Sequence, residues 1–393
     1  MKKISYKHKI LRMLIALEAL VLLFSILMIL KSNQQICEFF ATTFARGWIF
    51  LFGNLFGWIP LSLYELFLIA VIVGGITLVV FIIIFLCKKK WKRLLSTAII
   101  VAIALFSFLN VYTATASFSY GRNGLPNEVY AEYDGDDLTF EEAVELATNF
   151  IERANAAYHA TDHDADGNIV YPYTFREISN MLADEYKRLE SDYFSPYTPQ
   201  AKRIINKNIM SELHIVGVFF APFGEANING YETNLFLPHT MAHEMAHGKG
   251  VMREYDANLL AEYICITSEN AYLSYGAMVK CVYSAISIVG LYPNSSQAVT
   301  ELYEKLDEGI SIERNNYSKF YGQFTLLDDI GEFFNDIYLK LNKQENGTGS
   351  YFKPGEVSGT GQKDDDGKEI VQIINFSGTQ NLLIKLYKEG TLY

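Results

Sequence analysis

Residues 237–263, "LPHTMAHEMAHGKGVMREYDANLLAEY", decide the fold, and they hold three of the chain's seven histidines, His239, His243 and His247. His243 and His247 are four residues apart, so on a helix both imidazoles lie on one face, one turn apart, where both can bind one metal ion. Glu244 follows His243 directly and can reach a water molecule on that ion. The spacing therefore predicts a helix that carries a metal site and its base.

Two glycines predict a break after this helix. Gly248 and Gly250 are suited to a helix C-terminus, and a second helix is expected to begin near Met252. That second helix carries Glu254, seven residues after His247. Because a catalytic zinc site has three protein ligands and one open position, we expect Glu254 to be the third ligand.

Other polar residues of the stretch compete for these roles. Asp256 is two residues after Glu254, so on a helix it points about 200° away and the two acids cannot both face the ion. We favour Glu254. Glu262 lies two turns further and is expected to be structural or to support a ligand. Pro238 predicts that His239 lies at or before the helix start, which leaves it a possible contact for substrate or for a developing oxyanion.

These motifs resemble known families. "HEMAH" and "EYDAN" match the H-E-x-x-H and E-x-x-A-D/N signature of the gluzincin-type zinc metallopeptidases. The chain also resembles a bacterial membrane family catalogued as domain of unknown function 3810 (DUF3810), through "FGEANIN" at 223–229, "HEMAHGKG" at 243–250 and "REYDANLLAEYICITSENAYLSYG" at 253–276. The resemblance covers the apolar N-terminal segments and residues 215–345. It implies a mostly α (α+β) fold, in which three N-terminal transmembrane helices precede a zincin-like domain with a small sheet.

The resemblance also implies a role for each residue. Zn²⁺ would be bound by His243, His247 and Glu254, and Asn258 would hydrogen-bond a metal histidine and so fix its tautomer. Glu244 would act as general base, taking a proton from a zinc-activated water molecule and passing it to the leaving amine. For a second oxyanion stabiliser the candidates are, in order, Tyr275, Tyr272 and His239.

The segment "GEANIN" has two interpretations. Zinc peptidases commonly hold substrate as an added strand at a sheet edge near the metal helix. Residues 223–236 lie just before that helix, and Glu225, Asn227 and Asn229 are candidate substrate-binding residues. The alternative is a turn stabilised by its asparagine side chains. The pattern does not decide between them.

Hydropathy and charge divide the chain at about residue 117. Residues 10–30, 60–87 and 94–113 are apolar runs of about the length that a bilayer requires, and they predict a membrane anchor over 1–117. This part has a charge balance of +9, whereas residues 118–393 have a balance of −20. The acidic domain is not expected to bind nucleic acid, since phosphate contacts need clustered Lys and Arg.

The basic loops predict the topology. The N-terminus and "KKKWKR" at 88–93 are basic, and basic loops favour the cytoplasm. Three spans then put residues 118–393 outside the cytoplasm, and the aromatic residues 40–58 are expected at the outer interface. The predicted partners are the lipid bilayer and a peptide or protein substrate near it.

Smaller features have simpler interpretations. Cys265 and Cys281 are expected to be buried free thiols, although a bridge between them is the alternative. "DHDADG", which begins at Asp162, imitates the start of a calcium-binding loop, but Tyr173 stands where the bidentate glutamate is needed, which favours a solvated turn. Residues 345–368 are rich in Gly, Ser and Asp and are expected to form a loop or linker.

Three functions are compatible with these observations to different degrees. The first is a membrane-anchored zinc metallopeptidase that hydrolyses peptide bonds outside the cytoplasm. The second is a catalytically inactive zinc-binding domain that acts as an envelope sensor or assembly factor, which the intact Glu244 disfavours. Transport is disfavoured because the three spans contain little polar pathway. An intramembrane protease is excluded because residues 237–263 are too polar to span a bilayer.

Overall fold

The computed structural model describes residues 5–231, 233–342, 356–359 and 372–391, and these are mostly helical. The chain forms two compact units. The first contains Met1–Asn123 together with Phe220–Glu225, and the second contains Gly124–Phe219 and Ala226–Tyr393. The inclusion of the short segment 220–225 in the first unit was not predicted from the sequence.

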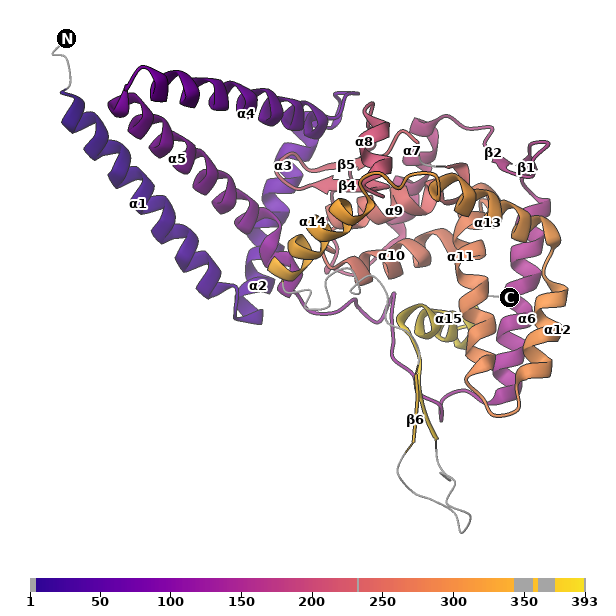
Figure 1. Cartoon of the computed structure of the whole chain (residues 1–393). Coiled ribbons are helices and arrows are strands. Elements are labelled where there is room, and N and C mark those ends of the chain that lie inside the picture. Colours follow the sequence, from indigo (N-terminus) through magenta and orange to yellow (C-terminus); the bar gives the residue numbers. More distant parts are fainter. Residues whose placement is uncertain (1–4, 232, 343–355, 360–371, 392–393) are drawn as a thin grey trace. The chain divides into compact units, whose positions relative to one another are not determined.

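Long apolar helices dominate the first unit (Figure 1). Helices α1 (Tyr6–Leu30), α4 (Leu63–Cys87) and α5 (Trp91–Thr115) overlap the three expected spans, and α1 packs against α5. No residue of α4 is buried, and a helix that is apolar on all sides yet exposed is suited to lipid. Several helices of the first unit could therefore span a membrane, as predicted.

The segment between α1 and α4 is helical. It consists of α2 (Gln34–Phe40), the π-helix η1 (Ala41–Ala45) and α3 (Arg46–Gly57). Residues Gln34–Gly57 together are long and apolar enough to cross a membrane, although the sequence analysis placed residues 40–58 at the interface. After α5 the short 3-10 helix η2 (Ser117–Gly121) closes this part of the unit.

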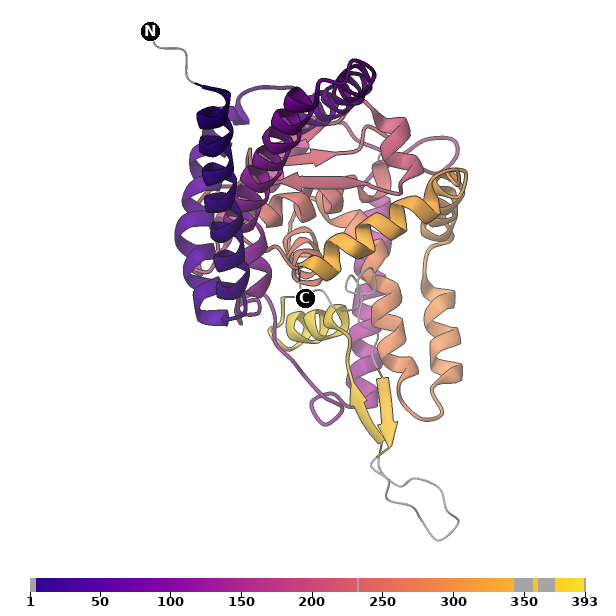
Figure 2. The same cartoon turned by 60° about the vertical axis from the view of Figure 1, so that its left-hand side comes forward.

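Helices also form the core of the second unit. Helix α6 (Phe140–His159) begins at a capping box formed by Thr139 and Glu142 and packs along α11 (Ala271–Gly290), as Figures 1 and 2 show. Helix α11 is apolar enough to span a membrane, but 72% of its most apolar window is buried within the protein, so it is a core helix. The remaining helices are α7 (Phe175–Glu185), η3 (Tyr186–Arg188), α8 (Lys207–Glu212), η4 (Asn234–Phe236), α9 (Leu237–Gly248), α10 (Glu254–Ile266), α12 (Ser296–Lys305), α13 (Glu308–Tyr321), α14 (Asp328–Leu341) and α15 (Gly378–Lys388).

A three-stranded sheet precedes α9, the predicted metal helix, in the sequence and contacts it through β3. Its order is β3 (Ala201–Arg203), β5 (Glu225–Ile228) and β4 (Gly217–Phe220), and β3 runs parallel to β5. The "GEANIN" segment thus supplies the central strand. The interpretation of this segment as an edge strand is wrong, because both sides of β5 are already paired.

Two small hairpins complete the described strands. Strands β1 (Asp162–His163) and β2 (Ile169–Val170) pair antiparallel, and the Asp164 side chain accepts the backbone N–H groups of Asp166 and Asn168 in the loop between them. This is the predicted turn. Strands β6 (Glu356–Gly359) and β7 (Gln372–Asn375) also pair antiparallel. The expected linker 345–368 lies outside the described residues, apart from β6.

Candidate metal centre

A glycine-dependent turn separates the two helices of the site. Gly250 has φ +94°, a conformation that glycine adopts without strain. Its N–H bonds to the carbonyl of His247, and the N–H of Val251 bonds to the carbonyl of Ala246. This pair of bonds is a Schellman motif. It ends α9 at Gly248, so the predicted glycine break is confirmed, and α10 begins at Glu254.

The same turn orients a histidine. His247 Nδ1 lies 2.7 Å from the carbonyl oxygen of Val251, and because a carbonyl only accepts, Nδ1 must carry the proton that it donates. The other nitrogen, Nε2, is thereby directed toward Glu254. A metal-binding histidine is typically held in this way by a hydrogen bond from its second nitrogen.

His243, His247 and Glu254 come together as a buried triad. Oε2 of Glu254 lies 3.1 Å from Nε2 of His243 and 3.6 Å from Nε2 of His247. One potential ligand atom from each residue lies within 4.8 Å of the other two, and all three residues are buried. The four-residue spacing on α9 places His243 and His247 next to each other, and the turn at Gly250 places Glu254 beside them.

The triad fits a zinc ion. Two imidazoles and one carboxylate are a known ligand set of catalytic zinc, and ligands at about 2.0–2.1 Å in tetrahedral geometry lie roughly 3.3 Å apart. The separations of 3.1 and 3.6 Å between Glu254 Oε2 and the two histidine Nε2 atoms bracket that value. Asp256 does not compete, because its Oδ2 accepts from Nε of Arg253 at 2.6 Å and forms an ion pair with the same guanidinium.

Glu244 is buried next to the triad with one carboxylate oxygen unsatisfied. The residue is 5% exposed, and its Oε2 has no hydrogen-bond partner among the described residues. The backbone N–H of Phe219 on β4 bonds to the carboxylate. A Cβ added to Gly217, on the same strand, would lie 2.5 Å from Glu244 Oε1. The side chain therefore occupies a space that only glycine at position 217 leaves open.

The charges of this cluster shift its pKa values strongly. Burial raises the pKa of Glu244 to about 8, and the charge of Glu254 adds to that effect. Burial opposes the charged forms of Glu254 and His247, yet their mutual attraction prevails. It lowers the pKa of Glu254 to about 2 and raises the pKa of His247 to about 9. Burial also lowers the pKa of His243. Without metal, His247 and Glu254 thus form an ion pair beside a neutral Glu244.

The predicted tyrosine donors have other partners. The hydroxyl of Tyr275 donates to Glu313 Oε2 at 2.7 Å, and that of Tyr272 donates to Asp162 Oδ2 at 2.8 Å. A tyrosine hydroxyl has one proton to donate, so in this arrangement neither has a proton left for an oxyanion. The preference for Tyr275 is therefore corrected. Its position on α11 could be predicted from the sequence, but the acid on α13 could not.

The residues of the "GEANIN" segment are bonded within the protein. Asn227 donates to the carbonyl of Val218, and Asn229 donates to Ser211 Oγ and to the carbonyl of Ile215. Glu225, within the first unit, accepts from the backbone N–H groups at 63 and 64 in the first turn of α4. All three side chains are buried. The structure gives them structural partners in place of the predicted substrate.

The remaining candidates lie on the same helices as the triad. Asn258 is half-buried on α10, one turn after Glu254, and its support of a metal histidine stays a prediction. Glu262, on the same helix, forms an ion pair with Lys280. His239 lies inside α9, whose first turn contains Pro238. His239 was expected at or before the helix start, and it lies within the first turn, because proline is tolerated there, where the missing N–H is not needed.

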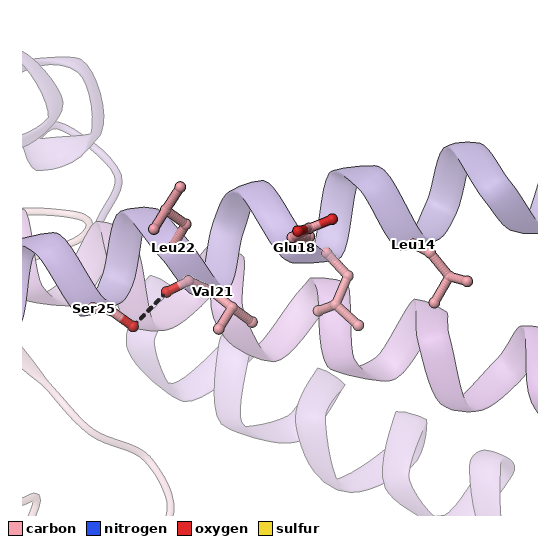
Figure 3. A pocket seen from close by; sticks show the side chains of 6 residues that line it. Leu14, Glu18, Val21, Leu22 and Ser25 are labelled. Atoms are coloured by element: carbon pink, nitrogen blue, oxygen red, sulfur yellow. Dashed lines mark hydrogen bonds between the residues drawn. The ribbon is translucent and has the colours of Figure 1, made fainter.

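A hollow on α1 is a different kind of feature (Figure 3). It is lined by residues of that one helix, among them Glu18 and Ser25, whose hydroxyl donates to the carbonyl of Val21. None of the candidate site residues lines it. Glu18, the acidic residue of this apolar helix, is exposed on the helix surface.

Several residues that shape the site were not predicted. Gly217 leaves space for the Glu244 side chain, and the carbonyl of Val251 accepts a hydrogen bond from His247. Arg253 donates a hydrogen bond to Asp256. The arginine, three residues before Asp256, is at a spacing that could have indicated the pair. Nothing in the local sequence pattern identifies Gly217 as a neighbour of Glu244, because the contact joins a strand to a helix more than 20 residues away.

Comparisons with known proteins identify the family. No curated protein and no solved structure matches the chain. The profile of one family matches residues 40–354, which is most of the chain, and its description is "Protein of unknown function (DUF3810)". The chain therefore belongs to the DUF3810 family.

Proposed function

We propose that this protein is a membrane-anchored zinc-dependent peptidase. The observation that carries the proposal is the buried triad of His243, His247 and Glu254 with the unsatisfied carboxylate oxygen of Glu244 beside it. Bound zinc would polarise a peptide carbonyl and make a water molecule acidic near neutral pH. An unpaired buried oxygen is costly to a fold, and such groups are commonly found where a ligand or reactant completes them.

The roles follow from the geometry of each side chain. The histidines offer Nε2 and Glu254 offers Oε2 to the same point. Glu244 follows His243 in sequence and is held by the Phe219 N–H through its carboxylate. Glu244 would accept the proton of the attacking water and deliver it to the leaving amine. The zinc charge would lower the pKa of Glu244 from its raised value and make the carboxylate available as a base.

Metal binding is the first test. The full chain, purified in detergent, is expected to contain one zinc ion per molecule by elemental analysis. Glu254→Ala is expected to lose it, whereas Asp256→Ala, the matched control on the same helix, is expected to keep it. A wild-type chain without stoichiometric zinc would refute the site, and zinc loss only in Asp256→Ala would refute the choice of Glu254.

Catalysis is the second test. A mixture of quenched fluorescent peptides is expected to be cleaved by the wild type and not by Glu244→Gln, which keeps zinc but cannot act as a base. General base catalysis contributes about 10²- to 10⁴-fold, and the loss is expected in that range. If Glu244→Gln and wild type behave alike while both bind zinc, the chain is a zinc-binding module and not a peptidase.

We further propose that the N-terminus and residues 88–93 lie in the cytoplasm and the second unit outside it. This requires α1, α4 and α5 to cross the membrane and residues 34–57 not to cross. Cys87, at the end of α4, is the exposed one of the four cysteines. A membrane-impermeant maleimide is expected to label Cys87 only after intact cells are permeabilised. Labelling in intact cells would refute this topology.

A further inference from the structure

His239 is the third histidine on the metal-binding face of α9. It precedes His243 by four residues inside the helix, so the two side chains are neighbours one turn apart. The residue is 7% exposed and does not belong to the triad. Such a buried imidazole, adjacent to a metal ligand but not itself a ligand, needs a separate explanation.

A lysine fixes the protonation state of this histidine. Lys280 Nζ on α11 lies 3.2 Å from His239 Nε2. An ammonium group only donates hydrogen bonds, so Nε2 must accept and the single proton of the neutral imidazole must be on Nδ1. Burial, followed by the charge of Lys280, lowers the pKa of His239 well below its usual value. The neutral Nδ1–H tautomer is therefore the favoured form.

A buried acid holds the lysine in place. Oε1 of Glu262, on α10, lies 3.2 Å from Lys280 Nζ, and Oε2 accepts the hydroxyl of Thr379. Glu262 is 1% exposed, and burying an ion pair is costly. Three helices thus each contribute one residue to a chain that runs from Glu262 through Lys280 to His239.

The proton on Nδ1 has no acceptor among the residues that the structure describes. Among the residues that the structure describes, Lys280 is the one hydrogen-bond partner of His239. Nδ1 is also not completely enclosed by protein atoms, so it keeps an open side. A buried N–H with an open side, one helical turn from a metal ligand, is a donor suited to an incoming ligand.

We propose that His239 donates a hydrogen bond from Nδ1 to the carbonyl oxygen of the scissile peptide as negative charge develops on it, and that Lys280, held by Glu262, is a positioning residue that keeps the proton on Nδ1. This inference rests on the proposed peptidase function. It assigns the donor role to His239 in place of Tyr275, whose proton is bonded to Glu313.

The tautomer is tested independently of catalysis. The full chain in detergent, labelled with ¹⁵N at its seven histidines, is expected to show, besides the metal ligands His243 and His247, one neutral histidine protonated on Nδ1 that disappears in His239→Asn. In Lys280→Met, which keeps the side chain as far as Cε and removes the donor, that signal is expected to shift toward the Nε2–H form. A wild-type His239 protonated on Nε2 would overturn the proposal whatever the activity.

Kinetics test the donor. Removal of one oxyanion donor typically costs about 10²- to 10³-fold in kcat, and His239→Phe is expected to lose that much with its zinc content and KM little changed. His239→Asn places an amide N–H near the position of Nδ1 and is expected to recover part of kcat. Lys280→Met is expected to lower kcat less than His239→Phe does. His159→Ala, on the exposed surface of α6, is the matched control.

The outcomes separate the two proposals. A wild type without zinc or cleavage removes the peptidase function and this donor role with it. A wild type that cleaves peptides, together with His239→Phe at full kcat, removes the donor role alone. If His239→Phe and His239→Asn lose kcat equally while both bind zinc and fold, His239 is structural and the proposal is wrong.

Discussion

Two buried glutamates of the second unit have opposite environments. Glu313, on α13, is 1% exposed and Glu244 is 5% exposed, and burial raises the pKa of both carboxyl groups. Oε1 of Glu313 accepts from the backbone N–H of Ile169, and Oε2 accepts from the hydroxyl of Tyr275. Glu244 has one oxygen without any described partner.

The two carboxyl groups differ in their hydrogen-bond donors. Burial and a raised pKa are shared, so neither distinguishes the sites. The donors do, because a fold that supplies a proton donor to each oxygen has used the carboxylate as a structural acceptor. Glu313 also lies 3.6 Å from His163 Nε2, so a nearby histidine does not mark a site either. Only the incomplete shell around Glu244 is left for a reactant.

Crowding Glu244 is expected to have the largest effect. In Gly217→Ala the new Cβ would lie 2.5 Å from Oε1, 2.7 Å from Cγ and 2.8 Å from Cδ of Glu244, so the whole carboxylate must move. A displacement of about 1 Å can cost about 10²-fold in rate, and peptide cleavage is expected to fall by that factor with zinc retained. The measurement is kcat together with zinc content.

The control for this change is Gly290→Ala. The Cβ at position 290 would lie 4.0 Å from Val299, which is ordinary contact, and cleavage is expected to stay at the wild-type level. Equal rates for Gly217→Ala and wild type would mean that the position of the Glu244 carboxylate is unimportant, and the contrast with Glu313 would lose its meaning.

Zinc binding is expected to release protons from His247 and Glu244 and not from Glu313. The pKa of His247 is about 9 without metal, so below that pH zinc must displace its proton. Because Glu244 also gives up a proton, zinc affinity is then expected to fall by more than tenfold for each pH unit from 8 toward 6. Glu244, with a pKa of about 8, would lose a second proton as the metal charge lowers that value.

Calorimetry in buffers of different ionisation enthalpy counts these protons. At pH 7 the wild type is expected to release more than one proton per zinc, and Glu244→Gln about one fewer, while Glu313→Gln is expected to match the wild type. Release of no proton by the wild type would contradict the His247–Glu254 ion pair.

Removing the tyrosine hydroxyl that donates to Glu313 is expected to have the smallest effect on catalysis. Tyr275→Phe leaves Oε2 of Glu313 without its hydroxyl partner, and an unsatisfied buried acceptor costs about 1–3 kcal/mol of unfolding free energy. Chemical denaturation of the second unit should register that loss, whereas kcat should change little. A large loss of kcat at unchanged stability would return Tyr275 to the catalytic role predicted from the sequence.

The sequence predicts the parts of the site that depend on local spacing. His243, Glu244 and His247 share one helix, and Gly250 and Glu254 follow within one turn and the start of the next helix, so helical periodicity and glycine conformation were sufficient. The mostly helical fold and the apolar N-terminal helices were predicted for the same reason. These features depend on residues fewer than 15 positions apart.

Features that depend on distant residues could not be predicted. The order of the sheet puts β5 between β3 and β4, and no pattern within "GEANIN" indicates two partners instead of one. Tyr275 finds Glu313 on another helix, and His239 finds Lys280. Local patterns predict which side chains share a face, but tertiary packing decides which of them are satisfied.

The short segment 220–225 has a practical consequence for handling the protein. Within the first unit the aromatic rings of Phe220 and Phe223 contact Phe67, and Trp48 donates to the carbonyl of Pro222. A chain truncated to residues 118–393 would lose all of these partners and expose an aromatic loop to water, which favours aggregation. Poor solubility of such a fragment would reflect the missing helices and not a failure of the second unit to fold, so detergent-purified full-length protein is the form to assay.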